Sequence, residues 1–355
     1  MSQNVVTVTA LSPPMSRKRA ALSRVLPAGV LRRLIETHRR TRTILALAGN
    51  GLYDLRRYLR WSSAGREELS QAQLAALVTL NYHRLEKGLA LKTPRPGFGQ
   101  DAVRLLMSLL DRYVARYGVD DTARAGIDTL DAYRAFGRTH GLNHPEVDAA
   151  IARLGGSRAD GVPPCGGTIP VDRATVAAAA PADPEAFFAT RHSVRQFADA
   201  EVDMDTIARA VRMAQRTPSV CNRQSWKVHV FSDAEQKRRV LSFQNGNRGF
   251  GDQASKVLVV TSDLQHFTSV GERFQCWIDG GLFAMSLVYA LHALGLGTCM
   301  LNWSVVKETD RAMRATAGIP DNEVVIMMIA VGHLPETLSV AHSLRKPLEE
   351  VLIAH

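Results

Sequence analysis

A stretch rich in glycine, proline and alanine, residues 154–184, divides this 355-residue chain into two parts with different hydrophobic patterns. It contains Pro163-Pro164 and the run from Ala177 to Ala180, a composition typical of a linker. Before it, apolar residues recur every three or four positions, which indicates helices. After it, short alternating and β-branched runs are mixed with helical patterns. A chain of this length can bury two cores of ordinary size, so we expect two folded regions.

The part before the linker predicts a helical domain, residues 61–153, that follows a basic segment, residues 1–60. Leu69 to Leu91 and Asp101 to Tyr117 each carry one apolar stripe at helical spacing. Between them, Thr93 to Gly99 contains two prolines and two glycines, which exclude a continuous helix.

The part after the linker, residues 185–355, predicts an α+β domain, because strands and helices are interspersed along it. Asp203 is a suitable N-cap for one helix, and a second helix is expected from Glu272 to Leu294, with a tight turn at Gly295 and Gly297. The predicted strands are Trp226 to Phe231, Lys256 to Thr261 and Val324 to Val331.

The net charge of +10 is confined to one segment. Residues 17–60 contain twelve Arg or Lys against Glu36 and Asp54, and the rest of the chain is balanced. Such a stretch is typical of a solvated or partner-docking face, of contact with an anionic membrane surface, or of nucleic-acid binding. No basic motif interleaved with aromatic residues supports nucleic acid as a partner.

Neither a membrane span nor a signal peptide is indicated. The longest apolar run of the basic segment, Ile44 to Ala48, is far shorter than the ~20 residues of a span. Residues 1–16 lack the charged and apolar regions of a signal peptide. We therefore expect a cytoplasmic protein that is peripheral to the membrane if the basic segment binds lipid.

The cysteines and two histidines predict buried, unreactive side chains. The four cysteines have neither CxxC spacing nor histidines at metal-ligand spacing, so we expect reduced thiols and no metal site. His292 and His333 lie in apolar surroundings and are expected to be core histidines with hydrogen-bond partners. The cysteines are Cys165, Cys221, Cys276 and Cys299.

A candidate phosphate-binding segment begins the second domain. Arg191, Ser193 and Arg195 alternate, so in an extended chain their side chains share one side. Two guanidinium groups and a hydroxyl can donate charge-assisted hydrogen bonds to phosphoryl oxygens. Taken alone, the same pattern is also typical of an exposed basic turn.

Four segments in this order resemble the nitroreductase family, over about residues 185–355: Arg191 to Arg195, Thr217 to Trp226, Leu294 to Cys299, and Ile329 to Gly332. The resemblance implies a nitroreductase-like sheet flanked by helices, here preceded by a mainly helical N-terminal domain. It also implies an intertwined homodimer with FMN at the interface. The adjacent glycines Gly280 and Gly281 would allow close helix contact there.

The resemblance assigns FMN contacts residue by residue. The first segment would hold the phosphate and ribityl chain, the second would contact the flavin from the other subunit, and the third would run beside the ring. Ser225 stands where the family usually has proline, which would loosen the turn, and Ser343 stands where many members have a second basic residue. The implied contacts are Arg191, His192, Ser193, Arg195, Pro218, Ser219, Val220, Asn222, Gln224, Asn247, Thr298, Cys299, Met300, Leu301 and Arg345.

The implied activity passes electrons from NAD(P)H through FMN to a small conjugated acceptor in two steps. The flavin carries this chemistry, so no separate catalytic residue is expected. Two alternatives remain open. One is a flavin dehydrogenase of a tethered or polymeric substrate, such as a peptide heterocycle or a saccharide-pathway intermediate. The other is a non-catalytic flavin-binding scaffold.

The most distinctive sequence of the first half is His83-Arg84-Leu85-Glu86-Lys87-Gly88. On a helix, His83 and Lys87 lie one turn apart. His83, Arg84, Glu86 and Lys87 could contact substrate or cover the flavin pocket. They could equally form an exposed charged turn that ends at Gly88 as a C-cap.

Overall fold

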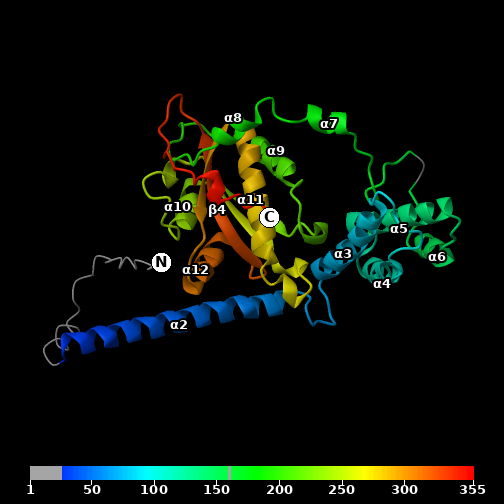
Figure 1. Cartoon of the computed structure of the whole chain (residues 1–355), viewed down its shortest axis with the longest axis horizontal. Coiled ribbons are helices and arrows are strands. Elements are labelled where there is room, and N and C mark those ends of the chain that lie inside the picture. The colour runs from blue at the N-terminus through cyan, green and yellow to red at the C-terminus, as the bar shows by residue number, and fades with distance from the viewer. Residues whose placement is uncertain (1–25, 159–160) are drawn as a thin grey trace. The chain divides into compact units, whose positions relative to one another are not determined.

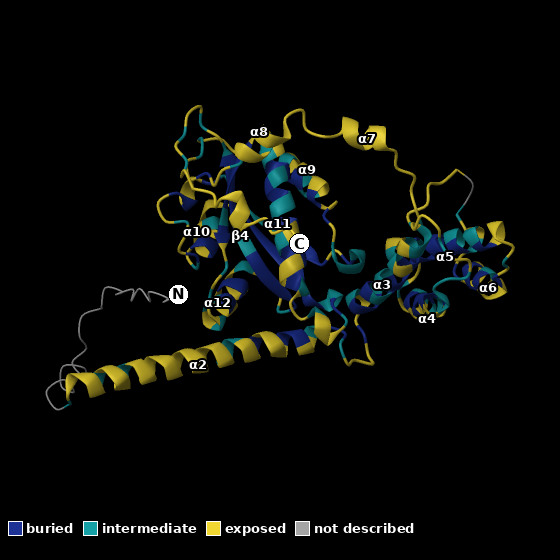
Figure 2. Ribbon diagram, viewed as in Figure 1, coloured by how far each residue is buried: buried dark blue, intermediate teal, exposed yellow. Residues whose placement is uncertain are grey.

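The computed structural model describes residues 26–158 and 161–355. These fall into two compact units, one up to Leu55 and one from Arg56 onward (Figure 1). The helix α2 (Ala28–Trp61) belongs to the first unit for most of its length and ends in the second. Most side chains of α2 are exposed (Figure 2). The basic residues from Arg17 to Arg24 lie outside the described residues.

Four helices after α2 pack around one apolar core, which includes the fully buried Leu74, Leu106 and Leu130. The first begins with a capping box: the Ser70 hydroxyl accepts a hydrogen bond from the Gln73 amide at 3.3 Å, and the Gln73 side chain accepts one from the Ser70 amide at 2.9 Å. The two helices expected from the sequence are confirmed as the first two of these. The helices are α3 (Gln71–Leu89), α4 (Gln100–Tyr117), α5 (Asp121–Thr139) and α6 (Pro145–Arg153).

Gly88 is not a C-cap, contrary to the sequence-based expectation. The helix continues through Leu89, and Ala90 occupies the cap position. A Cβ atom at Gly88 would lie 1.9 Å from a ring carbon of Phe98, in the loop before α4. The glycine is therefore required by the close approach of an aromatic ring, not by backbone conformation.

The predicted linker contains one short helix, α7 (Arg173–Ala178), in which no residue is buried. It is followed by α8 (Pro184–Ala189), where the Asp183 carboxylate accepts a hydrogen bond from the Ala186 amide at 2.8 Å.

The cysteines differ in burial, which corrects part of the sequence-based expectation. Cys276 and Cys299 are buried as expected. Cys165, within the linker, is exposed, and Cys221 is only partly buried. Cys165 lies where the linker meets α5: its amide donates to the Asp128 carboxylate at 2.9 Å, yet the residue stays exposed.

A four-stranded antiparallel sheet forms the centre of the domain predicted over residues 185–355, called the second domain below. The strands lie in the order β1-β2-β4-β3, so β1 and β3 are its edges. Each of the three strands expected from the sequence is present, and the segment after Gly295 is a fourth. The strands are β1 (Trp226–Phe231), β2 (Lys256–Asp263), β3 (Leu296–Asn302) and β4 (Glu323–His333).

Helices cover both faces of the sheet, which confirms the α+β class. On one face, Phe283 of α11 shares a core with Leu258 of β2 and with α9. On the other, Val240 of α10 and Met313 of α12 share a core with Met328 of β4. The helices are α9 (Met204–Ala214), α10 (Ala234–Leu241), α11 (Gln275–Ala293) and α12 (Lys307–Ala317).

Among the described residues, α11 alone is long and apolar enough to cross a membrane, but half of it is buried inside the fold. It is a core helix. A Cβ atom at Gly280 would lie 2.5 Å from the Ile326 side chain of β4, so this glycine lets α11 approach its own sheet. Gly281 meets nothing within 4 Å. Gly297 lies within β3, not in a turn, and packs against Val194.

A buried carboxylate joins three strands on one face of the sheet. Glu323 of β4 accepts hydrogen bonds from Thr261 Oγ1 at 2.6 Å, His229 Nε2 at 2.7 Å and Lys227 Nζ at 2.8 Å. Arg57, near the end of α2, donates to its main-chain carbonyl at 2.6 Å. Burial alone would raise the pKa of Glu323, but these hydrogen bonds outweigh it and lower the pKa to about 2.

This carboxylate should make the folded protein sensitive to acid. Because the folded pKa lies below the ordinary value of 4.5, the stabilisation is complete above that pH and is lost as pH falls toward about 2. Glu323→Gln should lower the free energy of unfolding at neutral pH by about 1.5–3 kcal/mol and flatten its dependence on acid pH. Urea unfolding across the acid range measures both effects. Glu235→Gln, at an exposed pair on α10, is the control; equal curves for the two variants would contradict this role.

Candidate active site

The Arg191–Arg195 segment runs along the free edge of β3. Ser193 forms a parallel bridge with Thr298, and the Val194 amide donates to the Thr298 carbonyl at 2.8 Å. The Val194 side chain is buried against Gly297, so the alternating side chains of Ser193 and Arg195 are left exposed. The segment therefore presents its polar side chains outward from a fixed backbone.

A histidine of α11 holds the residues that come just before this segment. His292 Nε2 lies 3.2 Å from Thr190 Oγ1 and 3.1 Å from the Phe187 carbonyl, at the end of α8. Burial lowers the pKa of His292, and the nearby Arg191 and His192 lower it further. His292 therefore has hydrogen-bond partners, as expected, but it is only partly buried and is not a core residue.

The other histidine of the prediction, His333, is also only partly buried. Its ring nitrogen Nε2 lies 3.3 Å from the Glu201 carbonyl. It therefore has a partner, as expected, but it lies at the end of β4 and not within the core.

The third predicted segment contributes mainly backbone. Cys299 and Leu301 of β3 are each 2% exposed and point into the core beneath α10 and α12. Thr298 is also buried, whereas Met300 is partly exposed. Burial raises the pKa of the Cys299 thiol, so this cysteine is not a thiolate.

The Thr217–Trp226 segment holds an unusual backbone. Cys221, Asn222 and Gln224 have positive φ angles of 48°, 53° and 48°, in the left-handed region that favours glycine. Two of them belong to a short 3-10 turn, η1 (Val220–Asn222). Each such residue costs on the order of 1 kcal/mol, and such strain clusters at functional sites. A conformation of this kind persists only when surrounding groups impose it.

An ion pair between a buried arginine and a partly buried glutamate supplies that support. Arg223, 3% exposed, donates to Glu272 at 2.5 and 3.1 Å, and its Nε donates to the Val220 carbonyl at 3.2 Å. Burial acts to raise the pKa of Glu272, but the Arg223 guanidinium and the Thr268 amide lower it below its ordinary value. The guanidinium also lies over the Phe267 ring. Arg223 thus ties η1 to the segment that precedes α11.

A second carboxylate holds η1 from α11. Asp279, 2% exposed, accepts hydrogen bonds from the Val220 amide at 3.2 Å and from Gln275 Nε2 at 2.9 Å. Burial raises the pKa of this carboxyl. Ser219 Oγ accepts a further hydrogen bond from the Gln224 amide at 3.0 Å.

Ser225, which stands where the family usually has proline, is bonded to β2. It is 1% exposed, its hydroxyl lies 2.8 Å from Ser262 Oγ, and its carbonyl accepts a hydrogen bond from the Asp263 amide at 2.7 Å. These contacts with β2 fix the position of the turn without a proline ring.

The sequence did not single out Arg223, Glu272 or Asp279. Arg223 lies between Asn222 and Gln224, the two neighbours to which the resemblance assigned FMN contacts. The sequence did contain a signal for Asp279. It is a lone carboxylate in an otherwise apolar helical pattern, and a buried carboxylate requires hydrogen-bond partners.

Two of the predicted FMN contacts, Asn247 and Arg345, form hydrogen bonds with residues of their own loops. Asn247 donates its side-chain amide to the Leu241 carbonyl at 2.9 Å and to the Gln244 carbonyl, so it fixes its own loop. Arg345 is exposed, and its guanidinium donates to the carbonyl of Ser343, which has a φ of 51°. Neither residue forms a hydrogen bond with the Arg191–Arg195 segment within the described part of the chain.

The charged motif of α3 is engaged within the helical domain. His83 Nδ1 lies 3.1 Å from Glu86 Oε2, and Glu86 Oε1 accepts from the Gly167 amide of the linker at 3.2 Å. Arg84 bridges to Asp101 at 2.6 Å, and Lys87 is exposed. Glu86 therefore helps to attach the linker, and Lys87 is the member most available to another molecule.

The helical domain also packs against the Thr217–Trp226 segment, called the strained segment below because of its positive φ angles. The helix α3 contacts η1 and η3 (Leu264–His266), and Ser70 Oγ lies 2.7 Å from Gln265 Oε1. Just before α3, the Ser63 amide donates to the Phe267 carbonyl at 3.0 Å. The Tyr58 hydroxyl donates to the Ser269 carbonyl, and burial raises the pKa of Tyr58 to about 12.

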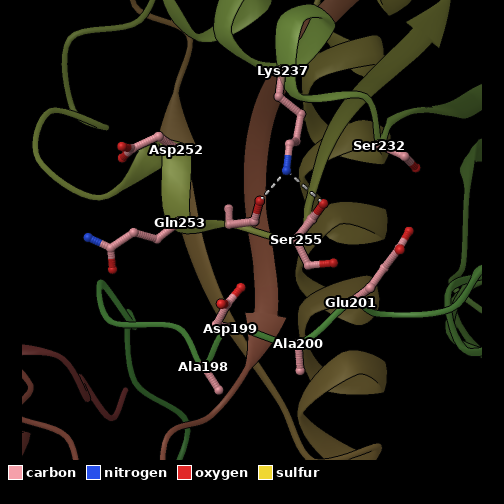
Figure 3. Close-up of a pocket in the computed structure, with 10 residues that line it drawn as sticks. Ala198, Asp199, Ala200, Glu201, Ser232, Lys237, Asp252, Gln253 and Ser255 are labelled. Atoms are coloured by element: carbon pink, nitrogen blue, oxygen red, sulfur yellow. Dashed lines mark hydrogen bonds between the residues drawn. The ribbon is translucent and has the colours of Figure 1, made fainter.

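A polar pocket of about 290 Å³ lies beside the Ala198–Glu201 segment (Figure 3). Its ammonium group, Lys237 Nζ, donates to the Ala254 and Ser255 carbonyls at 2.6 and 3.0 Å. The neighbouring Lys256 pairs with Glu201 at 2.6 Å. None of the predicted cofactor contacts lines this pocket, and its cations are already engaged, so it is not the candidate active site.

Comparison with known proteins identifies the second domain. Residues 188–244 and 240–333 match the model of the nitroreductase family. A protein of Archaeoglobus fulgidus described as an NADH dehydrogenase/NAD(P)H nitroreductase is 27% identical over 148 residues, 41% of this chain and 81% of its own. An NADH dehydrogenase of Thermus thermophilus is 26% identical over 195 residues, 46% and 91% of the two chains.

Among solved structures, an FMN-dependent nitroreductase of Clostridium difficile is 22% identical over 44% of this chain and 91% of its own, with a TM-score of 0.38. The family match does not extend to the residues before 188. Residues 188–333 thus match the nitroreductase family, and over this region the chain is similar to oxidoreductases described as NADH dehydrogenases and NAD(P)H nitroreductases.

Removal of Arg223 should destabilise the fold more than removal of an exposed arginine. Arg223→Met leaves the partly buried Glu272 without its partner, which should cost about 1.5–3 kcal/mol of unfolding free energy. Arg216→Met, at an exposed position just after the end of α9, is the matched control. Urea midpoints compare the two variants, and indistinguishable midpoints would show that the ion pair does not support the segment.

Proposed function

We propose that residues 185–355 bind FMN, and that the protein uses NAD(P)H to reduce it and a small conjugated acceptor to reoxidise it. The observation that carries this proposal is the combination of an outward-facing Arg/Ser segment on a sheet edge with a strained, rigidly held loop, both within the nitroreductase-family domain. The names of the two curated relatives support NAD(P)H as the donor.

The Arg191–Arg195 segment fits a phosphate. Ser193 and Arg195 are exposed and Arg191 is partly exposed, and neither of the two arginines pairs with a carboxylate among the described residues. Their guanidinium groups are therefore available for bidentate hydrogen bonds to phosphoryl oxygens. Because the Val194 amide and side chain fix the backbone, little conformational entropy would be lost on binding.

The strained segment fits a flat, polar ring system. Gln224 is exposed and Asn222 partly exposed, and the amide groups of both can donate and accept hydrogen bonds. Arg223 and Asp279 hold the backbone in place, so these groups are pre-organised. When bound, FMN would supply the hydride-accepting and electron-donating chemistry. The chain would supply binding, orientation and exclusion of water.

We also propose a homodimer with FMN at the interface. The outer face of α11 and the residue before it expose four large apolar side chains, with exposed fractions of 42–61%. Soluble monomers rarely expose such a cluster without a partner. Light scattering should give twice the chain mass of 38.9 kDa, and the mass of one chain would contradict the dimer. The side chains are Phe274, Trp277, Ile278 and Leu282.

The activity is tested by anaerobic addition of NADH or NADPH to the FMN-loaded protein. We expect at least one of them to bleach the visible absorbance of the bound flavin, and a quinone or nitroaromatic acceptor added afterward to restore it. Free FMN at the same concentration is the control. Failure of both nucleotides to bleach protein-bound flavin would contradict the proposal. It would favour a flavin dehydrogenase of a tethered substrate, which the helical domain could bind where α3 contacts η1.

A further inference from the structure

One face of α2 is apolar along nearly its whole length. Residues at spacings of three and four fall within about 100° of the helix circumference, since each residue advances the helix by about 100°. Threonine is the only polar residue type in this stripe. Its members are Val30, Leu34, Thr37, Thr41, Ile44, Leu45, Ala48, Leu52 and Leu55.

The large side chains of this stripe are exposed on the helix. These side chains have exposed fractions of 45–66%, from Val30 at 45% to Leu45 at 66%. In a long helix, a contiguous apolar surface of this kind marks a binding surface, because its exposure to water is unfavourable.

Basic residues border the stripe, and acidic residues do not. Arg33 and Arg40 lie along one edge and Arg42 beyond the other. Both acidic residues of α2, Glu36 and Asp54, lie on the far side of the helix. None of the arginines between residues 32 and 42 forms an ion pair within the described part of the chain.

We propose that α2 lies flat on an anionic membrane surface. The apolar stripe would enter the boundary between headgroups and acyl chains, and the bordering arginines would contact lipid phosphates. Each arginine near an anionic surface contributes on the order of 1 kcal/mol, a contribution that salt screens. The proposal concerns a surface outside the flavin domain and goes beyond the proposed function.

The charge pattern favours lipid over two other occupants. A second copy of α2 packed stripe to stripe would place arginines against arginines, because no acidic side chain borders the stripe to pair with them. Nucleic acid would bind the basic residues but would leave the apolar stripe exposed to water. An anionic bilayer satisfies both features of the helix at once.

The test is co-sedimentation of the full-length, FMN-loaded protein with phosphatidylcholine vesicles that contain or lack phosphatidylglycerol. The stripe variant Leu34→Glu/Leu45→Glu/Leu52→Glu is compared with Thr43→Glu/Ala46→Glu/Asn50→Glu, which changes the charge equally on the opposite face of the same helix. Flavin content and light-scattering mass of each variant show whether its fold and assembly are unchanged.

We expect the wild-type protein to sediment with phosphatidylglycerol vesicles and to be released by high salt. The stripe variant should lose at least tenfold in apparent affinity, and the opposite-face variant should lose less than threefold. Absence of wild-type binding to anionic vesicles would overturn the proposal. So would equal losses in the two variants, or a lower oligomeric mass of the stripe variant without vesicles, which would identify a second copy as the occupant.

Discussion

The ion pair between the buried Arg223 and the partly buried Glu272 is the interaction on which the candidate active site depends. It holds three left-handed backbone positions in and just after η1, and it does so from the segment that leads into α11. Breaking it would leave a partly buried charge, which is more costly than the strain of the loop. The same segment receives the Tyr58 hydroxyl and the Ser63 amide, so the end of α2 and the start of the helical domain are attached to it.

The second half of the site depends on an unpaired sheet edge. The strand order makes β3 an edge strand, with one side unpaired by other strands. The Arg191–Arg195 segment lies along the start of that side, where the Val194 amide donates to the Thr298 carbonyl. A sheet edge offers backbone groups that another segment can bind. Here it places the arginines on a rigid support, and His292 fixes the chain just before them. Both halves of the site are therefore built on α11 and the strands it covers.

Periodicity and capping rules were sufficient for most elements. The stripes that define α3 and α4, and the β-branched runs that define β2 and β4, are local signals that tertiary structure did not override. The reasons for the glycines could not be inferred from the residues next to them in sequence. Gly88 is required by Phe98 and Gly280 by Ile326, and both contacts join segments that are distant along the chain or paired only after folding. A single sequence does not reveal such pairs.

The candidate site was predictable where the chain itself carries the chemistry. The alternation of Arg191, Ser193 and Arg195 indicated an outward-facing polar edge, and the structure leaves those side chains accessible. The supporting residues were not predictable in the same way, because Arg223 depends on a partner almost fifty residues away. The surroundings of Cys165 were missed for a similar reason, because its amide binds Asp128, 37 residues away.

The central claim is that the Arg191–Arg195 segment holds the phosphate of FMN. The most direct measurement is the FMN dissociation constant of the purified protein, followed by its visible spectrum, with Arg191→Ala compared with Arg173→Ala on the exposed helix α7. The account predicts that the wild-type protein and Arg173→Ala bind FMN alike, and that Arg191→Ala binds about tenfold to a hundredfold more weakly, as expected for the loss of a charge-assisted hydrogen bond. Equal affinity of all three proteins would contradict it.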